Sequence, residues 1–217
     1  MRLGRALVRK PKIAGEAAEE LAQMARYKPG HKERTSQKIL DAAARLFREK
    51  GVAGARVEDV MGAVGLTVGG FYRHFDSKEK LLCEAISRAF ESSRALIEAT
   101  PKELRGRRWL ELAAALYLSE AHRDNVSGGC PLPALSGDVA RGPQSVRRHF
   151  EAELKAIVAA ITERLEGTPE ERESTAWQFC AAAMGALLLA RTVVDPDLSN
   201  RILESARALF EQDQPGR

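Results

Sequence analysis

The spacing of the apolar residues constrains this fold most, because it follows a helical period along the chain. In the stretch 35–50, for example, Ile39, Ala43 and Leu46 fall on one helical face, and Gly51 then ends the pattern. No segment alternates apolar and polar residues for long enough to predict a β-strand. The sequence therefore predicts an all-α protein.

Further helices are predicted near 57–64, 67–75, 78–100, 103–122, 131–141, 144–166, 169–191 and 197–212. The segment 1–30 ends in the breaker pair Pro29-Gly30, and the helix that it could form at 14–26 has only a thin apolar face. We expect this basic segment to be a mobile arm or a loosely held helix.

The net charge of +4 is unevenly distributed over the 217 residues. Residues 1–94 contain 19 Lys and Arg against 12 Asp and Glu, whereas the rest of the chain contains 15 against 18. This split favours a part that binds a polyanion, joined to a part with another role. The basic excess is small for an architectural protein that binds DNA of any sequence, and sequence-selective binding would distinguish the two.

The three cysteines, Cys83, Cys130 and Cys180, form no C-x-x-C pair, which argues against a disulfide scaffold or a structural zinc site. We expect no metal, no cofactor and a cytoplasmic location. The longest run free of both charge and strong polarity, 179–190, has about 12 residues, where a membrane span needs roughly 20. It predicts a buried helix, and we expect no membrane partner.

Two short apolar stripes meet at Gly65-Leu66-Thr67, which is the pattern of a helix-turn-helix. Gly65 tolerates the backbone angles of the turn, and Leu66 is expected to fill its corner. Such a unit places its second helix in a groove of DNA, although a small helical subdomain without a DNA role has the same geometry. Hydroxyl, cationic and ring groups that can bind phosphates follow the turn, at Thr67, Tyr72, Arg73, His74 and Lys78.

The strings TSQKILDAAARLF at 35–47, VEDV at 57–60 and VGLTVGGFYRHFDSKEKL at 64–81 resemble the DNA-binding domain of TetR-family transcriptional regulators. The resemblance covers about residues 33–90. It implies a homodimeric repressor whose last two helices pair with a second copy, and whose small-molecule effector lowers its affinity for operator DNA. With the segment 1–30 as an arm outside the resemblance, we expect a DNA-binding domain at 31–94 and a ligand-sensing and dimerisation domain at 95–217.

Residue by residue, the resemblance assigns phosphate contacts to Tyr72, His74 and Lys78, and the cap of the recognition helix to Thr67. Base contacts fall on its first turn, Val68, Gly69 and Gly70. These three residues offer few hydrogen-bonding groups, so we expect part of the specificity to come from Arg73, from residues before the second helix or from DNA shape.

One departure from the family pattern lies at the start of the second helix, where Ala55-Arg56 replaces the usual Ser or Thr cap. Arg56 either supplies a charged phosphate contact in its place or is an exposed, solvated side chain.

The C-terminal half offers candidates for an interface and for an effector pocket. Leu187, Leu188 and Leu189 and the small residues before them favour a helix interface, with a ligand cavity as the alternative. The final helix carries apolar Leu198 and Leu209 at helical spacing. Five aromatic residues either surround an effector or form plain core: Trp109, Tyr117, Phe150, Trp177 and Phe179.

Cys130 precedes Pro131 at a predicted helix start, where the helix dipole lowers the pKa of a thiol. The segment Gly-Cys-Pro-Leu resembles one in several TetR branches, including electrophile-sensing ones, which makes Cys130 a redox candidate; the alternative is a small apolar residue packed under a loop. No H-E-x-x-H, G-x-S-x-G, G-x-G-x-x-G or Walker A string occurs. The remaining enzyme hypothesis is a Cys130 nucleophile with His122 or His149 as its base.

Overall fold

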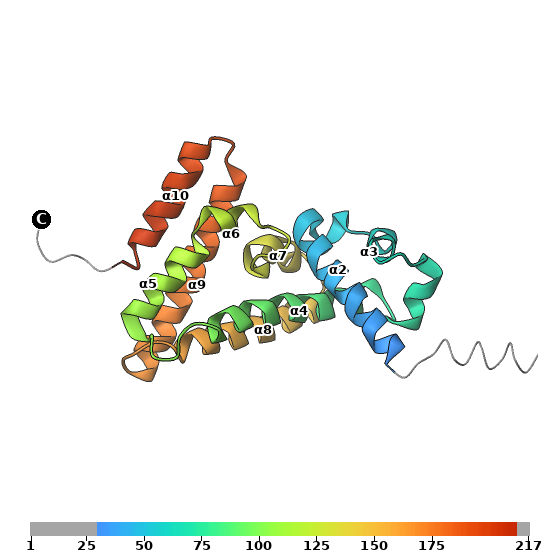
Figure 1. Cartoon of the computed structure of the whole chain (residues 1–217), viewed down its shortest axis with the longest axis horizontal. Helices are drawn as coiled ribbons and strands as arrows, with labels where there is room; N and C mark the ends of the chain where they lie inside the picture. The colour runs from blue at the N-terminus through green and yellow to red at the C-terminus, as the bar shows by residue number, and fades with distance from the viewer. Residues whose placement is uncertain (1–29, 212–217) are drawn as a thin grey trace, which may run out of the picture. The chain divides into compact units, whose positions relative to one another are not determined.

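The computed structural model describes residues 30–211, which contain helices and no β-strand, as the apolar spacing predicts (Figure 1). The elements are α2 (His31–Gly54), α3 (Val57–Ala63), the 3-10 helix η1 (Val68–Arg73), α4 (Lys78–Glu98), α5 (Gly106–Tyr117), α6 (Glu120–Asp124), α7 (Pro131–Ala140), α8 (Gln144–Thr162), α9 (Pro169–Thr192) and α10 (Pro196–Ala208). The arm expected at 1–30 lies outside the described residues except for Gly30. The described residues from Lys38 onward form one compact unit, which holds every helix after α2.

The predicted end of the first helix coincides with a break in α2 at Gly51, whose φ of 71° is left-handed. A Cβ atom at this position would lie 2.9 Å from Oδ2 of Asp138 on α7. The same Oδ2 accepts a 2.7 Å hydrogen bond from the backbone N–H of Val52. Glycine is therefore required both by the backbone angle and by the close approach of the α7 carboxylate.

The corner between α3 and η1 has the expected turn but not the expected filler. Gly65 has a φ of 71°, and the N–H of Leu66 bonds to the carbonyl of Met61 at 2.9 Å. The Leu66 side chain is 37% exposed, which contradicts its predicted role, whereas Met61 is fully buried. The Met61 methyl group lies 3.7 Å from where a Cβ of Gly70 would stand, so Met61 fills the corner instead.

The element that follows this corner, η1, is a six-residue 3-10 helix rather than an α-helix. Two of its residues are the consecutive Gly69 and Gly70, and glycine is a poor α-helix former. Short 3-10 segments are common where an α-helix is not favoured over more than one or two turns.

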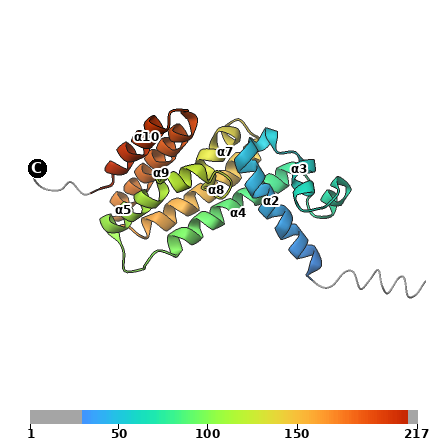
Figure 2. The same ribbon diagram turned by 45° about the horizontal axis from the view of Figure 1, so that its top comes forward.

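The remaining helices pack around a continuous apolar core. Helix α4 lies along α8, and α9 packs against both α8 and α10 (Figures 1 and 2). The helix predicted at 103–122 divides into α5 and α6, because Ser119 accepts a 3.2 Å hydrogen bond from the N–H of His122 and caps a new helix. Within residues 30–211, no helix is both long enough and apolar enough to cross a membrane.

Candidate nucleic-acid interface and ligand cavity

The segment 67–78 presents polar side chains to solvent above two buried rings. Phe71 and Phe75 are 1% and 3% exposed and stack with their ring centroids 5.9 Å apart, which fixes η1 onto the core. Tyr72, between them, is 72% exposed. The predicted DNA-contacting residues therefore divide by exposure: Arg56, Thr67, Val68, Gly69, Tyr72 and Arg73 are exposed, and Gly70, His74 and Lys78 are partly buried.

Thr67 precedes η1 with extended backbone angles, as a helix cap does, yet its hydroxyl accepts no hydrogen bond from the helix. The predicted side-chain cap is therefore absent. Ser77 does cap the next helix, since its hydroxyl accepts a 3.0 Å hydrogen bond from the N–H of Lys80. Helix α4 is thus fixed at its first turn, directly after the η1 segment.

The side chain of Lys78 makes two contacts with α2. Its ammonium group donates a 2.8 Å hydrogen bond to the carbonyl of Val52 and lies 6.0 Å from the ring centroid of Phe47. Both partners belong to α2, so Lys78 joins the start of α4 to the break in α2. An ammonium group has three donors, and the bond to Val52 uses one of them.

Arg56 precedes α3 without a Ser or Thr hydroxyl to cap it. Part of the cap is present nevertheless, because the Asp59 carboxylate accepts a 3.0 Å hydrogen bond from the N–H of Arg56. This backbone hydrogen bond holds the pKa of Asp59 below its ordinary value. The Arg56 side chain approaches the same carboxylate at 3.8 Å and is 75% exposed.

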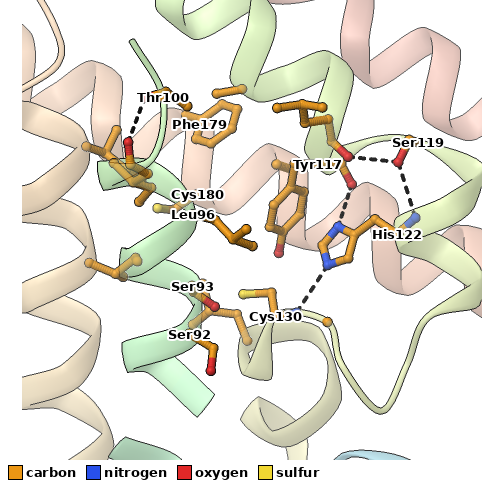
Figure 3. A pocket seen from close by; sticks show the side chains of 18 of the residues that line it. Ser92, Ser93, Leu96, Thr100, Tyr117, Ser119, His122, Cys130, Phe179 and Cys180 are labelled. Atoms are coloured by element: carbon orange, nitrogen blue, oxygen red, sulfur yellow. Dashed lines mark hydrogen bonds between the residues drawn. The ribbon is translucent and has the colours of Figure 1, made fainter. Parts of the chain in front are cut away.

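A second candidate site is a cavity of about 440 Å³ between α4, α5, α7, α8 and α9 (Figure 3). Three of the five predicted aromatic residues, Trp109, Tyr117 and Phe179, line it. The other two lie outside it. Phe150 packs edge-on against Phe90 with centroids 5.3 Å apart, and Trp177 is 38% exposed beside Glu173.

Sequence reasoning did not identify the other lining residues, which include Ser92, Ser93, Leu96, Thr100, Ser119 and His122. These residues come from α4 and from the segment around α6. Neither segment carries a sequence motif, and their helical spacing does not indicate a cavity. A ring of such residues forms when distant helices converge, and a local pattern does not report convergence.

Tyr117 and His122 give the cavity its polar end. The backbone N–H of Cys130 donates to His122 Nε2 at 3.1 Å, so the proton of the neutral ring lies on Nδ1 and is donated to the Tyr117 carbonyl at 2.7 Å. Burial lowers the pKa of His122. The Tyr117 hydroxyl is buried, and burial raises its pKa well above the ordinary value, with the neighbouring Cys130 thiol adding to the shift. Figure 3 shows this hydroxyl pointing toward Cys130.

Cys130 lies at the predicted helix start, immediately before α7, but its thiol does not have the predicted acidity. The residue is 8% exposed, and burial raises the pKa of the thiol. The loss of hydration therefore outweighs the helix dipole. Neither histidine of the enzyme hypothesis pairs with the thiol: His122 bonds to the backbone N–H of Cys130, and His149 Nε2 lies 2.8 Å from the Ser87 hydroxyl.

Helices α9 and α10 and the residues next to them expose several apolar side chains. Leu187 is fully buried in the core, whereas Leu188 and Leu189 are 45% and 58% exposed. Leu198 on α10 and Leu209 just after it are 38% and 64% exposed. The predicted interface residues are thus divided between the core and the surface.

Comparison with known proteins matches residues 39–85 to the family model of bacterial regulatory proteins, tetR family. An uncharacterised HTH-type transcriptional regulator of Mycobacterium tuberculosis is 29% identical over 196 residues, which cover 83% of this chain and 96% of the relative. The HTH-type transcriptional repressor KstR2 of Rhodococcus jostii is 44% identical over 48 residues, 22% of this chain and 24% of the relative. A crystal structure of a TetR transcriptional regulator from Chloroflexus aurantiacus has a TM-score of 0.66 and 25% identity, covering 82% of this chain and 93% of the other.

Proposed function

Because this chain belongs to the TetR family of bacterial transcriptional regulators, we propose that it represses transcription as a homodimer and that a small-molecule effector releases it from a palindromic operator. Residues 31–94 would form the DNA-binding domain, and residues 95–217 the ligand-sensing and dimerisation domain. The observation that supports this assignment best is the segment 67–78, in which exposed polar side chains alternate with the buried rings of Phe71 and Phe75.

In this proposal the phosphate contacts come from Tyr72, Thr67, His74 and Lys78, with Arg56 as a further cation. The Lys78 ammonium keeps two donors after its bond to Val52, so it can hold a phosphate and α2 together. The Thr67 hydroxyl caps no helix and is exposed, which supports a role in contacting DNA.

Base contacts would come from Val68, Gly69 and Gly70 at the start of η1, with Arg73 near its end. Val68 is 38% exposed and suits a thymine methyl group. The two glycines allow the backbone to approach the bases closely, because no side chain stands between them.

The exposed leucines of α9 and α10 support dimerisation through these two helices, since burial in a symmetric interface would remove them from water. Two copies would then place their η1 segments in successive major grooves, about 34 Å apart.

The cavity between α4 and α9 would hold the effector. Its volume lies within the range of about 300–1,000 Å³ that is typical of small-molecule sites. An effector that favours another spacing of the two DNA-binding domains needs a coupling free energy of about 1–3 kcal/mol to weaken operator binding 5- to 150-fold.

Cys130 would serve as a packing residue in this regulator, and its burial-raised pKa supports that role over an electrophile sensor. A thiol that titrates above the free value of ~8.5, together with unchanged DNA binding after electrophile treatment, is the expected result. A reactive thiolate at neutral pH and release of DNA by the electrophile would favour the sensor instead.

The proposal is tested by selecting bound sequences from random DNA with the full-length protein. We expect enrichment of a palindrome whose half-sites are about one helical turn apart, and a dimer or a pair of dimers on each site. Binding that shows no sequence preference would contradict the regulator and favour an architectural role.

A further inference from the structure

A second pocket, of about 280 Å³, adjoins the cavity and differs from it in charge. Both pockets are lined by Ser92 and Gly128. They therefore meet where one residue has only a small hydroxyl side chain and the other has no side chain. Figure 3 shows Ser92 at the Cys130 end of the cavity, away from Thr100 and Phe179. The second pocket is otherwise lined by residues of α2 and α4 and by one loop residue: Asp41, Ala44, Arg45, Arg48, Arg88 and Ser127.

The turn that contains Gly128 leaves little room for a side chain at this position. A Cβ atom there would lie 2.8 Å from the Asn125 side chain, whose Oδ1 accepts a 3.0 Å hydrogen bond from the N–H of Gly128. No side chain therefore closes the boundary between the two pockets at this point.

The three arginines of the second pocket are not equivalent. Arg88 is bonded to Asp41 at 2.7 Å, and Arg45 lies 3.5 Å from Glu49. Among the described residues, no carboxylate lies within 4.0 Å of the Arg48 guanidinium, whose Nε donates to the Ser127 carbonyl at 2.6 Å.

Arg48 is also partly buried, and burial lowers its pKa. A guanidinium group removed from water is stabilised by an anion more than by a neutral carbonyl, because charge-assisted hydrogen bonds to carboxylates are short and strong. The two terminal nitrogens of Arg48 match the two oxygens of a carboxylate.

The lining of the cavity suits the uncharged part of a ligand. None of its lining residues is Asp, Glu, Lys or Arg, and most of its wall is apolar, including Leu96, Trp109 and Phe179. The hydroxyl groups of Tyr117 and Ser93 offer uncharged polar contacts within this wall.

We propose that the effector is an apolar monoanion of the carboxylate type, whose uncharged body fills the cavity and whose anionic group passes between Ser92 and Gly128 to reach Arg48. The inference rests on the proposed effector site and specifies its ligand. Arg48 lies on α2, three residues before the break at Gly51, where Val52 is bonded both to Asp138 and to Lys78. The anion therefore binds the same helix that anchors the first residue of α4, and ligand binding acts directly on the support of the η1 segment.

The test compares matched probes that differ only in charge. Decanoate and 1-decanol form one pair, and naphthalene-2-carboxylate and naphthalene-2-methanol form a second. Their dissociation constants for the full-length protein are measured by calorimetry. We expect at least one carboxylate to bind about tenfold or more tightly than its alcohol, as one charge-assisted contact provides. Equal affinities within both pairs, or no binding of either carboxylate, would overturn the proposal without any variant.

The Arg48→Gln variant tests whether Arg48 is the source of the preference for the carboxylate over the alcohol. It is expected to bind the carboxylate and the alcohol equally, whereas Arg141→Gln, an exposed arginine outside both pockets, keeps the wild-type ratio. Arg48→Lys retains the charge and is expected to retain part of the ratio. A variant with a purely structural defect would weaken both probes alike, and an undiminished carboxylate preference in Arg48→Gln would overturn the role of Arg48.

Operator binding is measured separately on the DNA selected above. Carboxylate binding that depends on Arg48 but leaves DNA bound would support the ligand class and contradict effector-driven release. Sequence-specific DNA binding without any carboxylate preference would support the DNA-binding regulator and contradict the proposed ligand class.

Discussion

Tyr72 and Tyr117 carry the same hydroxyl group in opposite environments. Tyr72 is 72% exposed beside the buried Phe71, whereas the Tyr117 hydroxyl is buried beside the Cys130 thiol. An exposed hydroxyl is free to bond to a partner molecule and contributes little to folding, whereas a buried hydroxyl has lost its bonds to water and depends on the groups that surround it.

Tyr72→Phe is expected to weaken operator binding about tenfold, because a hydrogen bond to a charged phosphate contributes about 1.5–3 kcal/mol. Dissociation constants from a salt series measure the effect, which should be similar for specific and nonspecific DNA. Tyr117→Phe is the matched control: it removes the same atom and should leave DNA affinity unchanged. Unaltered binding by Tyr72→Phe would contradict the phosphate contact.

At the scale of elements, α2 and α7 are joined by one side chain. The Asp138 carboxylate accepts the N–H of Val52 at 2.7 Å, directly after the break at Gly51. This bond links residues 86 positions apart in the sequence, and it supplies the amide with a partner that the interrupted helix cannot provide.

Asp138→Ala is expected to lower the free energy of unfolding by about 1–3 kcal/mol, because it leaves the Val52 amide without its partner. Urea denaturation followed by circular dichroism measures it. Arg141→Ala removes only the exposed partner of the same carboxylate, at 3.0 Å, and should cost less than about 1 kcal/mol. Equal losses in the two variants would show that the bond to Val52 is not the stabilising one.

Helices α4 and α8 are joined by a second polar cluster. Burial raises the pKa of Glu153, but hydrogen bonds from Ser87 at 2.6 Å and Arg94 at 2.7 Å prevail and hold it below its ordinary value. His149 faces the same Ser87 hydroxyl at 2.8 Å. A carboxylate with a depressed pKa stabilises the fold fully above its unfolded pKa of about 4.3, and this stabilisation is lost as the pH falls through the folded pKa.

Glu153→Gln is therefore expected to be less stable than the wild type at neutral pH, with a difference that shrinks as the pH falls below about 4. Unfolding free energies from pH 3 to 7 measure this, and Ser87→Ala, which removes one of the two donors, should reduce the acid dependence partly. A difference that is constant with pH would contradict the ion pair as its source.

At the scale of the whole molecule, the exposed leucines of α9 and α10 belong to the proposed dimer interface. Leu189→Asp is expected to shift the protein from dimer to monomer, because it places a charge within the proposed apolar interface. Sedimentation velocity measures the change, and operator binding should fall with it. Ala156→Asp, on an exposed position of α8, should leave the dimer intact. A dimeric Leu189→Asp protein would place the interface elsewhere.

Most helices could be predicted from the sequence, because apolar periodicity and glycine positions act over one or two turns. Gly51 and Gly65 are both at left-handed angles, as their positions at the ends of apolar stripes indicate. The predictions failed where a side chain had a choice of neighbours: Leu66 is exposed and Met61 fills its place, and the double glycine gives η1 in place of an α-helix.

By itself, the sequence determined the all-α class, the helix-turn-helix and the resemblance to TetR-family regulators, since each depends on residues close together in the chain. Only the tertiary structure decided that burial raises the pKa of Cys130, that Phe150 and Trp177 lie outside the cavity, and that Arg48 adjoins it without a carboxylate partner. These properties depend on which helices converge and how much water they exclude. Helices that converge bring together residues dozens of positions apart in the sequence. Local periodicity therefore does not predict which of these residues meet.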